Sequence, residues 1–102
     1  MTVERVKDIM YPYFGAWNGV TYDEETATYI WCDELEYQIR DYPNGDFCSI
    51  LVCFIDDETH SYLEFYYCDY ENIYDLLEDV FADETMDRLN KMVEHRLFEI
   101  NL

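Results

Sequence analysis

Hydrophobic and polar residues follow two different periods along this chain, and the changes of period divide it into three parts. Near the start, apolar residues recur at helical spacing from Val3 to Phe14, and Thr2 is a suitable N-cap. Between residues 16 and 68 the pattern becomes that of strands, and from Ile73 it returns to 3.6 residues. The pattern predicts an α+β domain with an N-terminal helix, an antiparallel β-meander of three to five strands, and two C-terminal helices.

The strand part contains several runs rich in β-branched and aromatic residues, separated by turn signals. In the run 34–42, Leu35, Tyr37 and Ile39 alternate with polar residues, which predicts one buried face and one wet face. Asp33 and Glu34 either form a tight turn between two strands or bulge one long strand, and the pattern leaves both open. The strand candidates are 16–22, 26–32, 34–42, 47–55 and 60–68.

The segment YPNGDF (42–47) is the strongest turn signal, because Asn-Gly tolerates the positive φ that tight hairpins need. The run FCSILVCFI (47–55) that follows it is apolar on both faces, which predicts a central strand. In the run 60–68 we expect Tyr62, Glu64 and Tyr66 on one side of the strand.

The C-terminal part predicts two helices. The stretch ENIYDLLEDVFADE (71–84) carries a helical apolar stripe, and ADET (82–85) gives a second helix start. From Met86 to Ile100 the pattern continues as a helix. Its residues expected to face inward are Leu89, Met92, Val93, Leu97 and Ile100.

Charge changes this picture more than any motif does. The 102 residues form one domain (1–102) with 24 acids and 6 bases, a net charge of −18. From Asp8 to Asp87 there are 21 acids and a single base, Arg40. A plain interpretation is a soluble acidic protein. Such a surface repels nucleic acid and anionic membranes, so we expect neither to bind directly, whereas a basic nucleic-acid-binding protein is a suitable partner.

The acids of 71–84 favour that second interpretation. If the stretch is one helix, Glu71, Asp75, Asp79 and Asp83 form a row along one face. Like charges at this spacing destabilise a helix, and ordinary wet faces mix signs. We therefore interpret the carboxylates as substitutes for nucleic-acid phosphates, with acidic turns and tyrosines adding contacts. The candidate partner-binding residues are Glu71, Asp75, Glu78, Asp79, Asp83, Glu84, Asp56, Asp57, Glu58, Glu64, Tyr62 and Tyr66.

Catalytic and metal-binding patterns are not evident. His60 and His95 stand alone, no nucleotide-binding motif occurs, and DDETH (56–60) lacks the spacing of a calcium loop. The four cysteines form no CxxC pair, and their apolar neighbours suggest buried small hydrophobes. We expect a non-enzymatic protein without cofactor or metal. With no signal peptide and no membrane span evident in the sequence, we expect it in the cytoplasm.

In its composition and order of elements the chain resembles the small acidic DNA mimics encoded by phages, of the anti-CRISPR type. The segments that carry the resemblance are VERVKDIM, FCSILVCFI and ENIYDLLEDVFADE. The resemblance implies an inhibitor whose carboxylates occupy the basic cleft in which a Cas effector nuclease such as Cas9 holds DNA or reads the PAM. It also implies that the protein acts in the cytoplasm of the phage's host.

Two alternatives have the same acidic character. One is an immunity protein or antitoxin that neutralises a basic nuclease toxin, and the other is an acidic structural protein of a phage. The basic residues Arg88, Lys91 and Arg96 depart from a uniform mimic surface. They serve either self-association, which would give a homodimer, or internal neutralisation.

Overall fold

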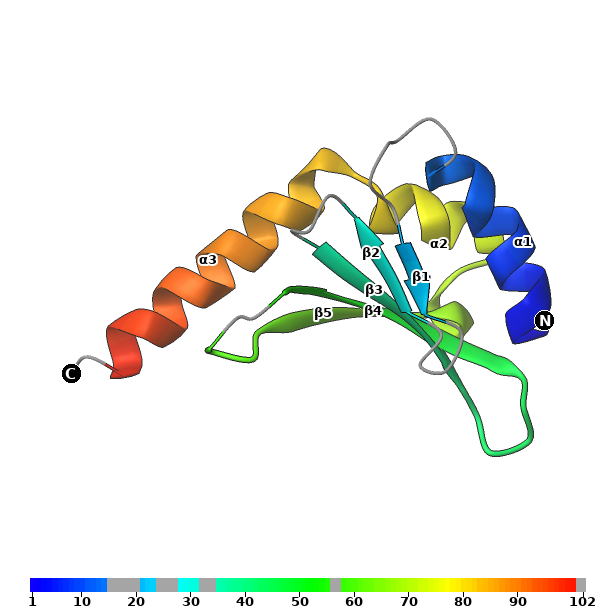
Figure 1. Ribbon diagram of the computed structural model, residues 1–102, viewed down its shortest axis with the longest axis horizontal. Helices are drawn as coiled ribbons and strands as arrows, with labels where there is room; N and C mark the ends of the chain where they lie inside the picture. The colour runs from blue at the N-terminus through cyan, green and yellow to red at the C-terminus, as the bar shows by residue number, and fades with distance from the viewer. Residues whose placement is uncertain (15–20, 24–27, 32–34, 56–57, 101–102) are drawn as a thin grey trace.

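The computed structural model describes residues 1–14, 21–23, 28–31, 35–55 and 58–100. Its order of elements is the predicted one: a helix, an antiparallel meander and two further helices (Figure 1). The five strands in the described part of the chain each pair with their neighbours in chain order. The α+β prediction is confirmed.

The N-terminal helix α1 spans Val3–Phe14. The Oγ1 atom of Thr2 accepts a hydrogen bond of 3.2 Å from the backbone N–H of Arg5, so Thr2 is the N-cap that the sequence predicts. The chain before α1 lies beside the Asn-Gly hairpin of residues 42–47, because the N–H of Phe47 donates to the carbonyl oxygen of Met1 over 2.8 Å. The helix is therefore fixed to the sheet at its very start.

The sheet consists of β1 (Thr21–Asp23), β2 (Thr28–Trp31), β3 (Leu35–Asp41), β4 (Phe47–Phe54) and β5 (Tyr62–Tyr66). Because β2 and β3 are separate antiparallel strands, the alternative of one long bulged strand is excluded. Asp33 and Glu34 themselves lie outside the described residues. The apolar strand β4 has a neighbour on each side, as a central strand should.

The Asn-Gly hairpin forms where the sequence predicts it, and Gly45 in its loop has a left-handed backbone at φ 88°. The N–H of Gly45 donates to the carbonyl oxygen of Tyr42, and the N–H of Tyr42 donates to that of Asp46. This is a three-residue loop closed by a glycine bulge, a common way to join two antiparallel strands.

One face of the sheet is covered by the helices, and alternation along the strands sets which residues lie there. Tyr37, Ile39, Ile50, Val52 and Phe65 join the buried core with residues from all three helices. The opposite face, which we call the outer face, carries three cross-strand rows: Glu36–Cys53–Tyr62, Gln38–Leu51–Glu64 and Arg40–Ser49–Tyr66. The predicted alternation of β3 is confirmed, since Leu35, Tyr37 and Ile39 are all buried.

After a 3₁₀ turn at Tyr67–Asp69, the two C-terminal helices are α2 (Ile73–Val80) and α3 (Asp83–Ile100). Ile73, Leu76, Leu77 and Val80 form the buried stripe of α2, as predicted. The start of α3 is packed through Leu89, whereas its second half extends away from the sheet (Figure 1). None of the helices in the described part is long and apolar enough to cross a membrane.

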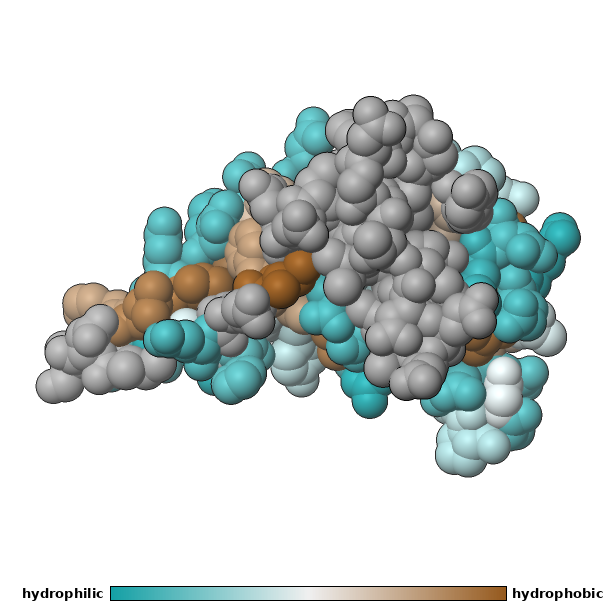
Figure 2. All heavy atoms as spheres, viewed as in Figure 1, coloured by the Kyte–Doolittle hydropathy of each residue, from teal (hydrophilic) through white to brown (hydrophobic). Residues whose placement is uncertain are grey.

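The expectation that Leu97 faces inward is wrong, because its side chain is 42% exposed and that of its neighbour Phe98 is 65% exposed. Because α3 continues past the sheet that buries Leu89, the sheet does not bury the same apolar stripe at Leu97. Figure 2 shows this apolar band running along α3 towards its C-terminal end.

The expectation of buried cysteines is also wrong for the three cysteines in the described part of the chain: Cys48 and Cys53 are half-buried and Cys68 is exposed.

Candidate partner-binding surfaces

The predicted row of four acids on one helix does not form. The Oδ1 atom of Asn72 accepts the backbone N–H of Asp75 over 3.0 Å and so caps α2 after Glu71. The helix ends at Val80, and the hydroxyl of Thr85 donates to the carbonyl oxygen of Asp79 over 2.9 Å at the start of α3. Of the row, therefore, only Asp75 and Asp79 lie four apart on one helix, while Glu71 precedes α2 and Asp83 opens α3.

The acids are nevertheless concentrated and exposed. Residues 69–87, which we call the acidic segment, contain eight carboxylates and no Lys or Arg, and all eight side chains are exposed. All six Lys and Arg residues and both histidines belong to the described part of the chain, and none of them forms an ion pair with this segment there. The eight are Asp69, Glu71, Asp75, Glu78, Asp79, Asp83, Glu84 and Asp87.

Local contacts hold two of these carboxylates in place. The amide of Asn72 donates to Oδ2 of Asp75 over 3.2 Å, in addition to capping the helix. The phenol of Tyr70 donates to Oδ2 of Asp79 over 2.8 Å. Tyr74, the residue before Asp75 on α2 and one turn before Glu78, is 58% exposed and adds an aromatic ring to the exposed side of the helix. The exposed side of α2 thus presents three acids and a ring, with Asp75 and Asp79 oriented by neighbours.

Helix polarity explains only part of this arrangement. Asp75 in the first turn of α2, and Asp83 and Glu84 in the first turn of α3, are stabilised by the partial positive charge of a helix N-terminus. Glu78 and Asp79 lie in the last turn of α2, where that effect is unfavourable and where no base is present. Helix polarity thus disfavours both acids, and of the two only Asp79 has a compensating bond, from the Tyr70 phenol.

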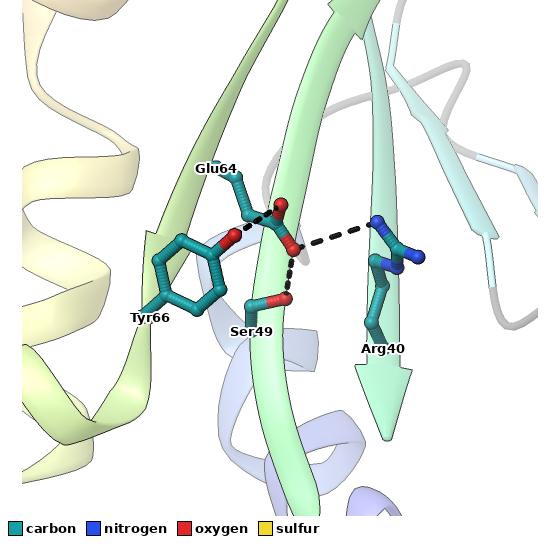
Figure 3. A network of polar contacts seen from close by, with 4 residues as sticks. All are labelled: Arg40, Ser49, Glu64 and Tyr66. Carbon is teal, nitrogen blue, oxygen red and sulfur yellow. Dashed lines mark hydrogen bonds and ion pairs between the residues drawn. The ribbon is translucent and has the colours of Figure 1, made fainter. Parts of the chain in front are cut away.

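The second predicted group, Tyr62, Glu64 and Tyr66, lies on the outer face of β5, on the opposite side of the sheet from α2. Figure 3 shows that side chains from three adjacent strands converge on the Glu64 carboxylate. Its Oε2 atom accepts from the Ser49 hydroxyl over 2.5 Å and lies 3.5 Å from Nη1 of Arg40, while Oε1 accepts from Tyr66 over 2.8 Å. The bond to Glu64 and the charge of that carboxylate raise the pKa of Tyr66.

This network neutralises Glu64 internally. Its side chain is only 12% exposed, and the single base of the long acidic part of the chain, Arg40, is its partner. A carboxylate that already has three donors is a weak substitute for a solvent-facing phosphate. The structure thus separates the predicted residues into an open group on the acidic segment and a compensated group on β5.

The remaining candidates are less informative. Glu58 is exposed near the turn that precedes β5, whereas Asp56 and Asp57 lie outside the described residues. Among the described residues, no group of three or more His, Cys, Asp or Glu side chains is arranged to hold a metal ion.

Sequence reasoning did not identify two features of the outer face: the compensation of Glu64 by Arg40 and the hollow near Glu36 described below. The alternation of Glu36, Gln38 and Arg40 along β3 indicates a polar face. The register in which β3 pairs with β4, and β4 with β5, brings these side chains to Ser49, Cys53 and Glu64, and that register cannot be deduced from the sequence alone.

Comparison with family models, with curated proteins and with solved structures finds no match to this chain.

Proposed function

We propose that this protein is a non-enzymatic inhibitor that binds a basic nucleic-acid-binding protein in place of DNA, with a Cas effector nuclease as its target. The observation that supports the proposal is the acidic segment, in which eight exposed carboxylates have no cationic partner in the described chain. Such charges attract an Arg- and Lys-lined cleft, and counterions are released from both surfaces on contact. No chemical step is required, because occupancy of the cleft excludes the target DNA.

Helix polarity strengthens this argument, since Glu78 and Asp79 are placed where an acid does not favour its own helix. A protein that only needed solubility would gain from mixed signs at these positions. Acids kept at an unfavourable position are explained by a partner that supplies the missing positive charge.

The direct test is DNA cleavage by a guide-loaded Cas9-type nuclease on a PAM-bearing substrate, with increasing amounts of this protein. We expect inhibition that is lost when the nuclease is given DNA first and that weakens with salt. If about four carboxylates are engaged, the affinity should fall about 100-fold between 50 and 200 mM salt, by analogy with the counterion release of DNA.

Variants locate the contact. In the described chain, no hydrogen bond or ion pair involves the side chains of Glu71, Glu78 and Glu84. Changing all three residues to Gln should therefore leave the fold intact. We expect it to weaken inhibition about tenfold or more, from three partner contacts of about 0.5 kcal/mol each. A matched triple, Asp8→Asn, Asp41→Asn and Glu94→Gln, removes the same charge elsewhere and should have little effect.

The results of these experiments distinguish between the candidate functions. Equal effects of the two triples would show that net charge, not the acidic segment, is responsible. Unchanged cleavage by Cas nucleases, together with neutralisation of a basic nuclease toxin, would identify an immunity protein instead. Binding to neither, at any salt concentration, would overturn the proposal.

A further inference from the structure

The outer face of the sheet contains a hollow at the end opposite Arg40. It has a volume of about 280 Å³ and opens to solvent. It is formed by the row Glu36–Cys53–Tyr62 with the ends of β4 and the turn before β5. Its lining includes Glu36, Leu51, Cys53, Phe54, His60 and Tyr62.

The carboxylate of Glu36 belongs to this hollow and has no cationic partner among the described residues. It is half-buried and accepts a hydrogen bond of 3.2 Å from the amide of Gln38 and one of 3.7 Å from the Cys53 thiol. Every Lys, Arg and His of the protein lies in the described part of the chain, and none pairs with Glu36 there. A partly desolvated carboxylate without a counter-charge is costly, and a cation that enters the hollow relieves that cost.

The same face shows what kind of cation fits. In the neighbouring row, the Glu64 carboxylate has a hydroxyl donor from β4 (Ser49), a tyrosine donor from its own strand (Tyr66) and the guanidinium of Arg40. At Glu36 the β4 neighbour is also a donor, the Cys53 thiol, and the row ends on β5 with a tyrosine, Tyr62, but no guanidinium pairs with this carboxylate among the described residues. Tyr62 is 51% exposed, which leaves its ring accessible.

We propose that this hollow binds the guanidinium group of an arginine side chain presented by a partner protein. The Glu36 oxygens offer a planar pair of acceptors that a guanidinium matches better than an ammonium does. The Tyr62 ring stabilises a cation near it, and Leu51 and Phe54 contact the aliphatic stem. The site lies on the sheet face away from the acidic segment, so it does not depend on the proposed function.

Backbone conformation at the rim agrees with a binding role. His60 has φ 54°, the one non-glycine residue with positive φ in the described chain. Left-handed backbone at such a residue is held by its surroundings: the hydroxyls of the two flanking residues, Thr59 and Ser61, are hydrogen-bonded to each other over 2.8 Å and both residues are buried. His60 is thereby placed in the lining of the hollow.

The test uses N-acetyl-arginine amide, with its neutral isostere N-acetyl-citrulline amide and the corresponding lysine compound, titrated into ¹⁵N-labelled protein at low salt. We expect saturable shifts at the backbone amides of Glu36, Cys53 and Tyr62 with the arginine compound, weaker ones with lysine and none with citrulline. Equal response to citrulline or to lysine would overturn the assignment of a guanidinium site.

Two variants complete the test. Glu36→Gln keeps the shape of the side chain and should weaken arginine binding about tenfold, as expected for loss of one charge-assisted pair. Tyr62→Leu should weaken it severalfold through loss of the ring. Glu71→Gln, the same charge change on the other side of the molecule, is the matched control and should bind normally. If Glu36→Gln and Glu71→Gln behave alike, the shifts report the general field of the protein and the site is refuted.

Discussion

The phenol of Tyr70 and the carboxylate of Asp79 are joined by a hydrogen bond of 2.8 Å that links the segment before α2 to the last turn of that helix. Burial of the phenol, this bond and the charge of Asp79 raise the pKa of Tyr70 to about 12. Because an anion in the last turn of a helix is unfavourable, the bond offsets part of the cost of keeping Asp79 there. It also holds one carboxylate of the acidic segment in a defined direction.

This pair predicts a specific loss of stability at high pH. A tyrosine whose pKa is higher in the folded than in the unfolded state contributes stability that is fully present below pH 10 and is lost as pH rises towards 12. We expect the urea midpoint of the wild-type protein to fall over this interval more steeply than that of Tyr70→Phe. At pH 7 the variant should be less stable by about 1 kcal/mol, the usual value of one hydrogen bond.

Tyr74→Phe is the matched control, since Tyr74 is exposed and makes no hydrogen bond in the described chain. Its pH dependence should equal that of the wild-type protein. An equally steep alkaline loss in Tyr70→Phe would show that other tyrosines, among them Tyr66, account for the effect.

Glu78 predicts opposite effects on stability and on function. Removing its charge relieves an unfavourable interaction with the C-terminal end of α2, so Glu78→Gln should raise the free energy of unfolding by about 0.3 kcal/mol or more. The same change should weaken inhibition of the target nuclease. Thermal melting and the cleavage assay on one preparation measure both.

Asp75→Asn is the comparison for Glu78, because Asp75 lies in the first turn of α2 and accepts a bond from Asn72. We expect this variant to lose stability, by about 0.5–1 kcal/mol. If both variants change stability in the same direction, helix polarity does not govern these positions, and the argument that Glu78 is kept for a partner fails.

Local signals in the chain were sufficient for most of the fold. Thr2 as a cap, the Asn-Gly turn, the alternation of β3 and the change of period at Ile73 each act through neighbours in sequence, and the structure confirms them. Position relative to distant elements was not predictable in this way. Leu97 continues the apolar stripe of Leu89, yet whether a stripe is buried depends on how far the sheet extends beneath it.

The same distinction applies to the candidate site. Composition identified the acidic segment, but the break between Val80 and Asp83 depends on capping by Asn72 and on the Thr85 bond to a carbonyl oxygen, and it divides the predicted row. Compensation of Glu64 by Arg40 depends on strand pairing, since the two residues are 24 positions apart in sequence. Charge alone therefore did not distinguish the compensated Glu64 from the exposed carboxylates of the acidic segment.

The projecting half of α3 leads to a prediction about the core. Leu89→Ala, at a fully buried position, should cost about 2–5 kcal/mol. Leu97→Ala should cost about 0.5 kcal/mol or less, because that side chain is 42% exposed. Urea unfolding of the two variants gives the comparison. A loss at Leu97 comparable to that at Leu89 would mean that another surface covers this end of the helix in solution, and a dependence of the loss on protein concentration would identify that surface as a second copy.

The outer-face network predicts an energetic coupling between Arg40 and Glu64. Arg40→Gln leaves a carboxylate that is 12% exposed with only the neutral donors Ser49 and Tyr66, so we expect a loss of about 1–2 kcal/mol. Glu64→Gln removes the charge that Arg40 compensates. The loss of stability in the double variant should therefore be smaller than the sum of the two single losses, by about 1 kcal/mol. Arg5→Gln, an exposed base without an ion pair in the described chain, is the control for net charge and should cost little. Additive losses in the cycle would show that Arg40 and Glu64 act independently, and the argument that this guanidinium exemplifies the ligand of the Glu36 hollow would then lose its basis.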